Sequence, residues 1–457
     1  MAIFNIPRIL ISASNRSSGK TTLSIGLSRA LARKGFSVQT FKKGPDYIDP
    51  MWLSIASSKD CHNLDLFMME KEAIISSFYV ETREAEITLI EGNMGLYDGF
   101  DLDGKGSTSN LARILKSPII LVIDATRMTR GIAPLLLGYL GFEPDIRIAG
   151  VILNKVSGAR HEKKLREAIG HYCGIEVLGA LPNLPEIEIK QRHLGLIPVA
   201  EEERTLELID KISEKVADSV DLARIVEIAN SALDLSIVEK KEKVAQKEKI
   251  KIGVARDSAF CFYYPQNLTS LRRAGAELIF FDALKDSLPN VDGLYIGGGF
   301  PEVFMNNLEE NVSLRRKIQK AVEEGMPVYA ECGGLIYLSR SIQWKGEKRM
   351  MVGSIPADIE IREKPKGHGY VVLKGKDGRL IKGHEFHYSE VVNLGNVDFA
   401  YQVLRGQGID GIHDGIVHKN ILASYTHIHS LSTPKWAEEL VSSVKKGRWE
   451  ISFAKVQ

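Results

Sequence analysis

Short apolar runs alternate with helix-compatible segments along the first part of this chain, and this alternation restricts the fold more than any other feature. The runs are rich in isoleucine, leucine and valine, as buried parallel strands are. Strands that alternate with helices form βαβ units, and repeated units build a parallel sheet with helices on both faces. The sequence therefore predicts an α/β fold with a doubly wound parallel sheet. The expected strands are residues 8–13, 36–41, 86–90, 118–124, 148–154 and 177–182.

The loop after the first expected strand, Ser14 to Thr22, resembles a phosphate-binding loop. It contains Gly-Lys-Thr and leads into a helical segment at 23–34. In such a loop, backbone N–H groups and the helix N-terminus bind phosphate oxygens, Lys20 adds a cation and the Thr21 hydroxyl ligates Mg²⁺. Ser14 stands where such loops usually have their first glycine, and an ordinary serine-rich loop is the alternative. The position between strand and helix favours nucleotide binding.

Charged residues follow the next strands, and parallel strands deliver their carboxyl ends to the same edge of a sheet. After the second strand, Lys42 is expected near phosphate, and Asp46 or Asp49 near the metal or near a partner of an acidic substrate. Glu91, after the third strand, is expected to bind Mg²⁺ directly or to hold one of its ligands. Asn154, after the fifth, is a candidate contact for adenine. For Lys42, Asp46 and Asp49, the alternative is a helix-capping loop whose charges face water. For Glu91 it is a carboxylate that only caps the next helix, and for Asn154 an ordinary strand-end turn.

A second series of strands begins after a charged segment, with runs at 250–255, 277–281 and 293–296. The chain of 457 residues is too long for one ordinary core. We therefore expect a nucleotide-binding domain at residues 1–236, a solvated charged linker at 237–249 and a second α/β domain at 250–457.

Cys332 lies in the most informative stretch of the second domain, residues 328–337. A short apolar strand is followed by this cysteine, two glycines and the start of an amphipathic helix. A side chain at such a turn stands clear of the sheet, and the glycines allow a substrate to approach closely. Ala330 departs from the glycine usual at that place, and a buried structural cysteine is the alternative. The pattern favours a nucleophilic thiol.

Further residues have the chemistry that a thiol nucleophile needs. Residues 297–299 are three glycines after a strand, whose N–H groups can form an oxyanion hole together with those around Cys332; a phosphate site or a structural turn is the alternative. A thiolate also needs a neighbouring imidazole. His427, which ends the expected strand 421–426, is the candidate base. Metal binding by the histidines near 384–387 and 427–429 is the competing interpretation.

The composition excludes several classes of function. A formal charge of +2 gives no reason to expect nucleic acid or an anionic membrane as a partner. The four cysteines share no C-x-x-C spacing, which disfavours a zinc site or a disulfide framework. No apolar run is long enough to cross a bilayer and no leader pattern is present, so a cytoplasmic protein is expected.

These motifs resemble those of the cobyrinic acid a,c-diamide synthases and their nickel-sirohydrochlorin and siroheme-type relatives. That family consists of glutamine-dependent amidotransferases with an N-terminal, dethiobiotin synthetase-like ATP-binding domain and a C-terminal class I glutaminase domain. The resemblance extends along nearly the whole chain. It is carried by residues 18–22, 41–49, 91–99, 297–302, 331–334 and 383–388.

The resemblance implies a carbon–nitrogen ligase that uses ATP and Mg²⁺ to amidate a tetrapyrrole carboxylate. It assigns Lys20, Thr21, Asp46 and Glu91 to ATP and Mg²⁺, and ammonia release from glutamine to Cys332 with His427. Where the family's glutaminases often carry Glu, two residues after this histidine, the chain has His429, so the third catalytic group stays open. The full ATP-binding set expected is Ser18, Gly19, Lys20, Thr21, Thr22, Lys42 and Asn154; the metal set is Thr21, Asp46 and Glu91; the substrate or acyl-phosphate set is Tyr47, Asp49 and Asp98; the oxyanion hole is Gly298, Gly299 and Gly333.

The expected reaction is amidation of the a and c acetate side chains of cobyrinic acid, a step in cobalamin biosynthesis. Nickel-sirohydrochlorin and siroheme-type rings are the alternative substrates. A nucleotide-switch protein with a non-catalytic glutaminase-like module is the rival from another class. A homodimer is expected only because dimers are common.

Overall fold

The computed structural model describes residues 2–187, 189–192, 195–202, 204–237 and 249–449, in two compact units of residues 1–241 and 242–457. Residues 238–248 of the expected linker lie outside the described residues, so the linker stays a prediction. Among the described helices, none is long and apolar enough to cross a membrane.

In the first unit, seven of the described strands form one sheet in the order β4-β3-β5-β2-β6-β7-β8. All its neighbouring strands are parallel, which confirms the doubly wound sheet. The strands are β2 (Arg8–Ala13), β3 (Val38–Lys43), β4 (His62–Leu64), β5 (Ile87–Glu91), β6 (Ile119–Asp124), β7 (Ile148–Val156) and β8 (Val177–Pro182). The helices are α1 (Lys20–Arg33), α2 (Ile48–Ser57), α3 (Lys71–Glu81), α4 (Thr108–Ile114), α5 (Ile132–Phe142), α6 (Ala159–Tyr172), α7 (Thr205–Ser219) and α8 (Leu222–Asn230).

Shorter elements complete the first unit. Strands β1 (Ala2–Phe4) and β11 (Leu235–Ile237) form an antiparallel pair, as do β9 (Gln191–Arg192) and β10 (Gly195–Leu196). Two short 3₁₀ turns span Pro185–Ile187 and Val199–Glu201.

Several local features differ from the sequence-based expectation. Glu91 is the last residue of β5 and Asn154 lies within β7, although both were expected after their strands. Strand β3 spans Val38–Lys43 rather than 36–41, so Lys42 and Lys43 are buried strand residues and not part of the following loop. The strand continues because Lys42 pairs with Glu91 on β5 and Lys43 with Leu64 on β4. Strand β4 was not expected, because three residues are too few to show a periodic pattern.

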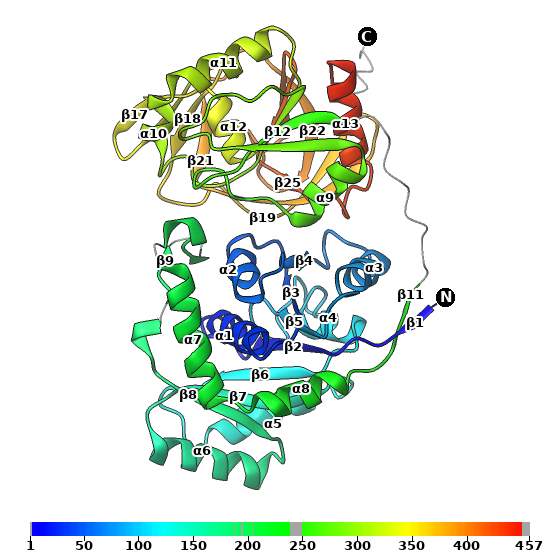
Figure 1. The fold of residues 1–457 in the computed structure, drawn as a ribbon, viewed down its shortest axis with the longest axis vertical. Coiled ribbons are helices and arrows are strands. Elements are labelled where there is room, and N and C mark those ends of the chain that lie inside the picture. Colours follow the sequence, from blue (N-terminus) through cyan, green and yellow to red (C-terminus); the bar gives the residue numbers. More distant parts are fainter. Residues whose placement is uncertain (1, 188, 193–194, 203, 238–248, 450–457) are drawn as a thin grey trace. The chain divides into compact units, whose positions relative to one another are not determined.

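Helix α1 places the phosphate loop and packs against α7, which lies beside it (Figure 1). Gly26 of α1 faces α7: a Cβ atom added to it would lie 2.4 Å from Val216 Cγ2 and 3.1 Å from Ile212 Cγ2. Arg29 also donates to Asp210 Oδ1 across this interface, at 2.7 Å. The middle of α1 is therefore held by a close helix–helix contact that leaves no room for a side chain at residue 26.

In the second unit, ten of the described strands form one sheet in the order β13-β12-β14-β15-β24-β23-β22-β19-β20-β25. The part from β13 to β24 is parallel and the remainder is antiparallel. The strands are β12 (Ile250–Ala255), β13 (Ala276–Phe281), β14 (Gly293–Ile296), β15 (Val328–Glu331), β19 (Gly367–Gly375), β20 (Leu380–His387), β22 (Asp398–Arg405), β23 (His413–His418), β24 (Ile421–Ser424) and β25 (His427–Ile428).

Helices and a smaller sheet accompany this large sheet. The smaller sheet has the order β17-β16-β18-β21, with β16 (Ser341–Trp344), β17 (Glu347–Met350), β18 (Asp358–Ile361) and β21 (Ser389–Val392). The helices are α9 (Pro265–Arg273), α10 (Met305–Glu310), α11 (Val312–Glu323), α12 (Gly333–Leu338) and α13 (Trp436–Lys446).

The alternation of side chains along its strands divides the core of the second unit into two clusters. On β14, Leu294 and Ile296 pack in one cluster and Tyr295 packs in the other. On β15, Val328 and Ala330 belong to the first and Tyr329 to the second. Successive residues of a strand point to opposite faces, so Glu331 follows Tyr329 onto the face that contains Tyr295.

We predict opposite effects for two glycine substitutions in the helices of the first unit. Gly26→Ala should destabilise the protein by about 1–3 kcal/mol, because the new methyl group overpacks the α1–α7 contact. Gly138→Ala, on α5, should be neutral or stabilise by about 0.5–1 kcal/mol, because Gly138 is exposed and an added Cβ would meet no atom within 4 Å. Urea unfolding of both variants measures the difference; equal effects would contradict the packing described here.

Candidate functional site

The phosphate loop of the first unit leads directly into α1, and the first residue of the helix bonds back to the loop. Lys20 is the first residue of the helix, and its Nζ donates to the carbonyl of Asn15 at 3.1 Å. Gly19 has φ +90°, and an added Cβ would lie 2.1 Å from Asn154 Nδ2. That amide donates to the carbonyl of Ser18 at 2.9 Å. Asn154 thus lies against the phosphate loop, and its contact with adenine stays a prediction.

Beside the loop, a cluster of largely buried charges joins four elements, α1, α2, β3 and β5. The Thr21 hydroxyl donates to Glu91 Oε1 at 2.6 Å and lies 3.3 Å from Asp49 Oδ2. Lys42 Nζ donates to the same Asp49 oxygen at 2.5 Å and to Glu91 Oε1 at 2.8 Å. Burial alone would lower the pKa of Lys42, but Asp49 and Glu91 more than offset this effect and raise it. Lys42 therefore stays a cation inside the protein.

Oxygen ligands of the kind that Mg²⁺ prefers are available in this cluster. Glu91 is 1% exposed, and its Oε2 accepts no hydrogen bond from the described residues. This carboxylate oxygen, the Thr21 hydroxyl and Asp49 are hard oxygen donors suited to Mg²⁺. Burial raises the pKa of Glu91, and the charge of Lys42 opposes that rise. The residues present therefore fit the ion.

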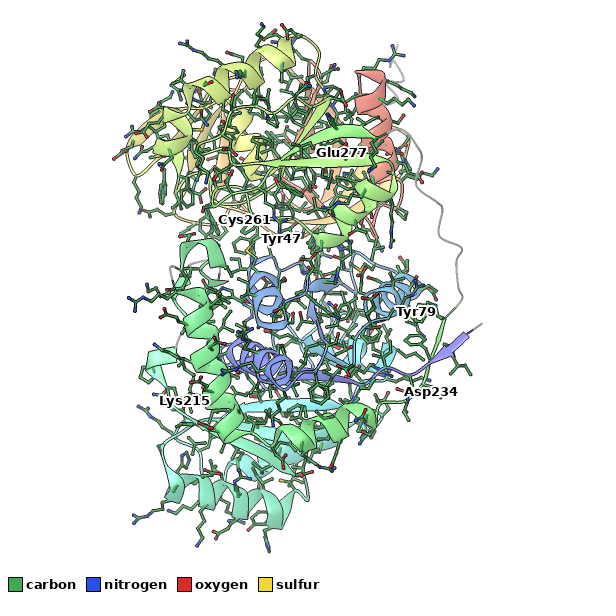
Figure 2. The ribbon with its side chains drawn as sticks, in the orientation of Figure 1. Tyr47, Tyr79, Lys215, Asp234, Cys261 and Glu277 are labelled. Carbon is green, nitrogen blue, oxygen red and sulfur yellow. The ribbon has the colours of Figure 1, made fainter. Side chains whose placement is uncertain are left out.

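The other residues expected around the substrate lie in the loops at the same sheet edge. Asp46 Oδ1 accepts from the N–H groups of Ile48 and Asp49 at 2.9 and 3.0 Å, so it caps α2; burial raises its pKa to about 7. Its assignment as a metal ligand stays a prediction. Tyr47 directly precedes α2 (Figure 2). Asp98 Oδ2 accepts from the N–H of Gly95 at 2.8 Å.

A cavity of about 360 Å³ beside the phosphate loop was not expected from the sequence. Its lining includes Gly19, Lys20, Thr21 and Asn154, and its remaining wall is largely apolar, as suits the flat face of a nucleotide base. The apolar residues after β8 were the available signal, because β8 ends at the same sheet edge as the loop. Leu184, Pro185, Ile187, Ile189 and Leu196 follow β8, and Leu181 and Pro182 are its last two residues.

In the second unit, Cys332 occupies a strained turn between β15 and α12. Its φ is 46° and its ψ is −96°, a conformation that costs a non-glycine residue about 1–3 kcal/mol. Its N–H donates to the carbonyl of Ser424 on the adjacent strand β24 at 2.7 Å, which anchors the turn. The side chain is buried. Burial, and secondarily the charge of Glu302, raises the pKa of the thiol, so forming a thiolate requires a base.

The expected oxyanion glycines and the expected base come together. A Cβ atom added to Gly333 would lie 3.1 Å from the backbone N of Gly299. One added to Gly298 would lie 2.5 Å from His427 Cε1 and 3.2 Å from His427 Nε2. The structure thus brings Gly298, Gly299, Gly333 and His427 to the turn that carries Cys332.

His427 is held differently from the expectation that it ends strand 421–426. Strand β24 ends at Ser424, and His427 belongs to the separate short strand β25, opposite His384 of β20. The residue at the position expected to hold a glutamate, His429, accepts from the N–H of Leu431 at 3.1 Å through Nδ1. Glu331, which the sequence analysis assigned no role, lies with Oε2 3.3 Å from His427 Nδ1. The sequence feature that could have identified Glu331 is its position: a carboxylate at the end of an apolar strand, directly before the candidate nucleophile.

Comparisons with known proteins match both units. Residues 9–197 match the family of the CobQ/CobB/MinD/ParA nucleotide binding domain, and residues 251–435 match the CobB/CobQ-like glutamine amidotransferase domain. The cobyrinate a,c-diamide synthase of Magnetococcus marinus is 45% identical over 95% of this chain and 96% of its own length. The chain belongs to the cobyrinate a,c-diamide synthase family.

Two further members of this family, from archaea, show similar agreement. The synthase of Archaeoglobus fulgidus is 43% identical over 97% of this chain and 98% of its own length. The synthase of Methanosarcina acetivorans is 42% identical over 97% of this chain and 96% of its own length. The resemblance inferred from the motifs is thereby confirmed, as are the phosphate-loop domain and the amidotransferase domain. In this chain, the phosphate loop lies within the matched nucleotide-binding domain, and Cys332 lies within the matched amidotransferase domain.

We predict that triphosphate binding takes up a proton at Lys20. Burial and then Lys42 lower the pKa of Lys20 to about 8, so a fraction of this lysine is neutral above pH 8. A bound polyphosphate favours the ammonium form and raises that pKa. Affinity for ATP should therefore fall as pH rises through 8 and beyond, with proton uptake on binding. Calorimetry in buffers of different ionisation enthalpy measures this uptake; Lys20→Arg, which cannot lose its charge, should abolish it. Identical uptake in that variant would exclude Lys20 as its source.

We also predict that Gly298→Ala strongly reduces glutamine hydrolysis. The methyl group would fall 2.5 Å from His427 Cε1. The imidazole must therefore move away from residues 297–299, which we call the glycine loop. A displacement of about 1 Å in a catalytic group can reduce rates on the order of 100-fold. Glutamate release measures the effect, and amidation driven by ammonium salts serves as the internal control. A wild-type rate of glutamate release would show that glutamine hydrolysis does not require His427 at this position.

Proposed function

We propose that this chain catalyses the ATP- and glutamine-dependent amidation of the a and c acetate side chains of cobyrinic acid, in the biosynthesis of cobalamin. The observation that carries the proposal is the presence of two built sites, a phosphate loop with buried charges and a strained cysteine turn, in a chain that matches the synthases over nearly its full length. The relatives reported above are named for cobyrinate, not for nickel-sirohydrochlorin or siroheme, which favours cobyrinic acid over both.

The first unit would activate the carboxylate. A free carboxylate does not react with ammonia at a useful rate, because its oxygen is a poor leaving group. Attack of a carboxylate oxygen on the γ-phosphorus of ATP releases ADP and gives an acyl phosphate. Lys20 and Lys42 would offset the negative charge of the phosphoryl group, while Tyr47, Asp49 and Asp98 would position the substrate. Ammonia then attacks the acyl carbon, orthophosphate leaves with the electron pair of the broken bond, and loss of a proton gives the amide.

An Mg²⁺ ion belongs to this proposal, held by Thr21, Glu91 and Asp49, with Asp46 as a further candidate ligand. When bound, it would neutralise phosphate charge. The buried Glu91 oxygen that accepts no hydrogen bond from the described residues supports the assignment. The chain's own part is to hold these oxygens at the end of the phosphate loop.

The second unit would supply the ammonia. His427 accepts the thiol proton of Cys332, and the sulfur attacks the side-chain amide carbon of glutamine. N–H groups around Gly298, Gly299 and Gly333 stabilise the resulting oxyanion. The amide nitrogen leaves as ammonia after taking the proton from His427, and water then hydrolyses the glutamyl thioester to glutamate. The strain at Cys332 supports this role, because a structural cysteine needs no left-handed backbone.

A cytoplasmic location and a homodimer complete the proposal. The location is favoured by a mechanism that needs ATP and a reduced thiol. The homodimer rests only on the frequency of two-fold oligomers.

The test is amidation by the purified protein with ATP, Mg²⁺ and glutamine, the amides being counted by mass spectrometry for cobyrinic acid, nickel-sirohydrochlorin and siroheme in parallel. We expect two amides on cobyrinic acid. Cys332→Ser should lose glutamine-dependent amidation and retain amidation with ammonium, because only the source of nitrogen is removed. Cys173→Ser, at the end of α6, is the matched control and should behave as wild type.

The alternatives predict other results. Glutamine-dependent amidation that survives in Cys332→Ser would refute the nucleophile. Nucleotide hydrolysis without amidation of any of the three rings would favour the nucleotide-switch protein with a non-catalytic module.

A further inference from the structure

Glu331 is the last residue of β15 and directly precedes Cys332, yet its carboxylate is directed to His427. Oε2 lies 3.3 Å from His427 Nδ1, and Oε1 accepts from the N–H of Ile428 at 3.3 Å. The carboxylate is 1% exposed. One buried carboxylate therefore contacts both the imidazole and the backbone of the strand that carries it.

The imidazole of His427 extends from this carboxylate toward the glycine loop. Its Nδ1 faces Glu331, while Cε1 and Nε2 lie 2.5 and 3.2 Å from where a Cβ of Gly298 would be. A proton on Nδ1, donated to the carboxylate, leaves the lone pair on Nε2. Nε2 is then the nitrogen that faces Gly298, and the loop of residues 297–299 lies against Gly333 of the turn that carries Cys332.

We propose that Glu331 is the positioning residue of the glutaminase site and takes the place of the glutamate that this chain lacks at residue 429. It holds His427 in the tautomer protonated on Nδ1 and stabilises the imidazolium that forms when the proton moves from Cys332 Sγ to Nε2. The same proton then passes from Nε2 to the departing ammonia, so the carboxylate never takes it. The inference rests on the proposed glutaminase activity and adds the group that orients its base.

The residue at the usual position is engaged elsewhere. His429 Nδ1 accepts a backbone hydrogen bond from Leu431, and its ring packs on Tyr264 with centroids 4.5 Å apart. A neutral imidazole has no negative charge with which to stabilise an imidazolium. Glu331 has that charge and the contact with Nδ1.

Two tyrosines fix the orientation of the Glu331 carboxylate. Tyr329 donates to Oε1 at 2.8 Å, and Tyr295 donates to Oε2 at 3.4 Å. Burial, followed by the charge of Glu331, raises the pKa of both phenols well above the ordinary value. The tyrosines therefore remain hydrogen-bond donors throughout the pH range of an assay.

Other ionisable groups also face the site. Glu302, after β14, and Glu385, on β20, raise the pKa of the Cys332 thiol together with Glu331. His384 of β20 stacks on His427 with centroids 5.0 Å apart, and burial, then His427 and His429, lowers its pKa well below the ordinary value. His384 is thus neutral, so among these groups Glu331 is the anion in contact with His427 Nδ1.

The decisive variant is Glu331→Gln, which keeps the size of the side chain and removes its charge. We expect kcat for glutamine hydrolysis to fall on the order of 10²- to 10⁴-fold, as when a comparable carboxylate is neutralised in a catalytic triad. KM for glutamine and amidation with ammonium should change less than about twofold, because this carboxylate binds neither glutamine nor ATP. Alkylation of Cys332 by iodoacetamide should require a higher pH than in the wild type, because the thiolate loses its stabilised imidazolium partner.

Asp414→Asn is the matched control. Asp414 is also a buried carboxylate of this unit, but it accepts its hydrogen bonds from the N–H groups of Gly415, Tyr425 and Thr426 and from the Thr426 hydroxyl. We expect a lower thermal stability with an unchanged pH profile of alkylation. Should Glu331→Gln fail to fold, Tyr329→Phe takes its place; it removes one donor to the carboxylate, and kcat should fall about 3- to 10-fold with the same direction of pH shift.

A wild-type kcat and alkylation profile in folded Glu331→Gln, or the expected losses in His429→Gln instead, would overturn the inference. Neither result would affect the proposed function. That function fails separately if Cys332→Ser retains glutamine-dependent amidation.

Discussion

Charge held away from water is the constraint on which both candidate sites depend. Moving an ion into the protein interior costs several kcal/mol unless partners offset the loss of hydration. In the first unit the partners are Lys42 with Asp49 and Glu91; in the second they are His427 with Glu331 and its hydroxyl donors. These pairs contribute little to stability, but each fixes the position of a side chain to which the proposed function gives a role in the reaction. The sheets are the frames that deliver the partners to one another.

The fold of the first unit could be predicted well because its information is local. Each apolar run formed a strand, and the Gly-Lys-Thr segment began a helix, because hydrophobic periodicity and backbone geometry act over a few residues. Lys20, Thr21 and Glu91 could be placed at one edge for the same reason. The position of Lys42 within β3 rather than after it could not, because the strand extends only through its pairing with Glu91 and Leu64.

The second unit shows where sequence reasoning ends. Cys332 and the glycine loop could be predicted, because each follows a recognisable apolar strand and contains turn-forming glycines. The contact between Glu331 and His427 joins residues 96 positions apart, and no periodicity encodes it. The antiparallel half of the sheet, in which His427 lies opposite His384, depends in the same way on distant pairing. The cavity beside the phosphate loop is similar: most of its apolar lining comes from the segment after β8, whose composition alone does not place it against the phosphate loop.

The left-handed backbone at Cys332 has an evolutionary consequence. A glycine there would adopt φ 46° without steric cost, so selection for folding alone favours losing the sulfur. Under the proposed function, cysteine at residue 332 persists because its chemistry is under selection. Descendants of this chain released from that selection would be expected to drift toward glycine at this turn, which makes the residue a marker of whether a related gene product still consumes glutamine.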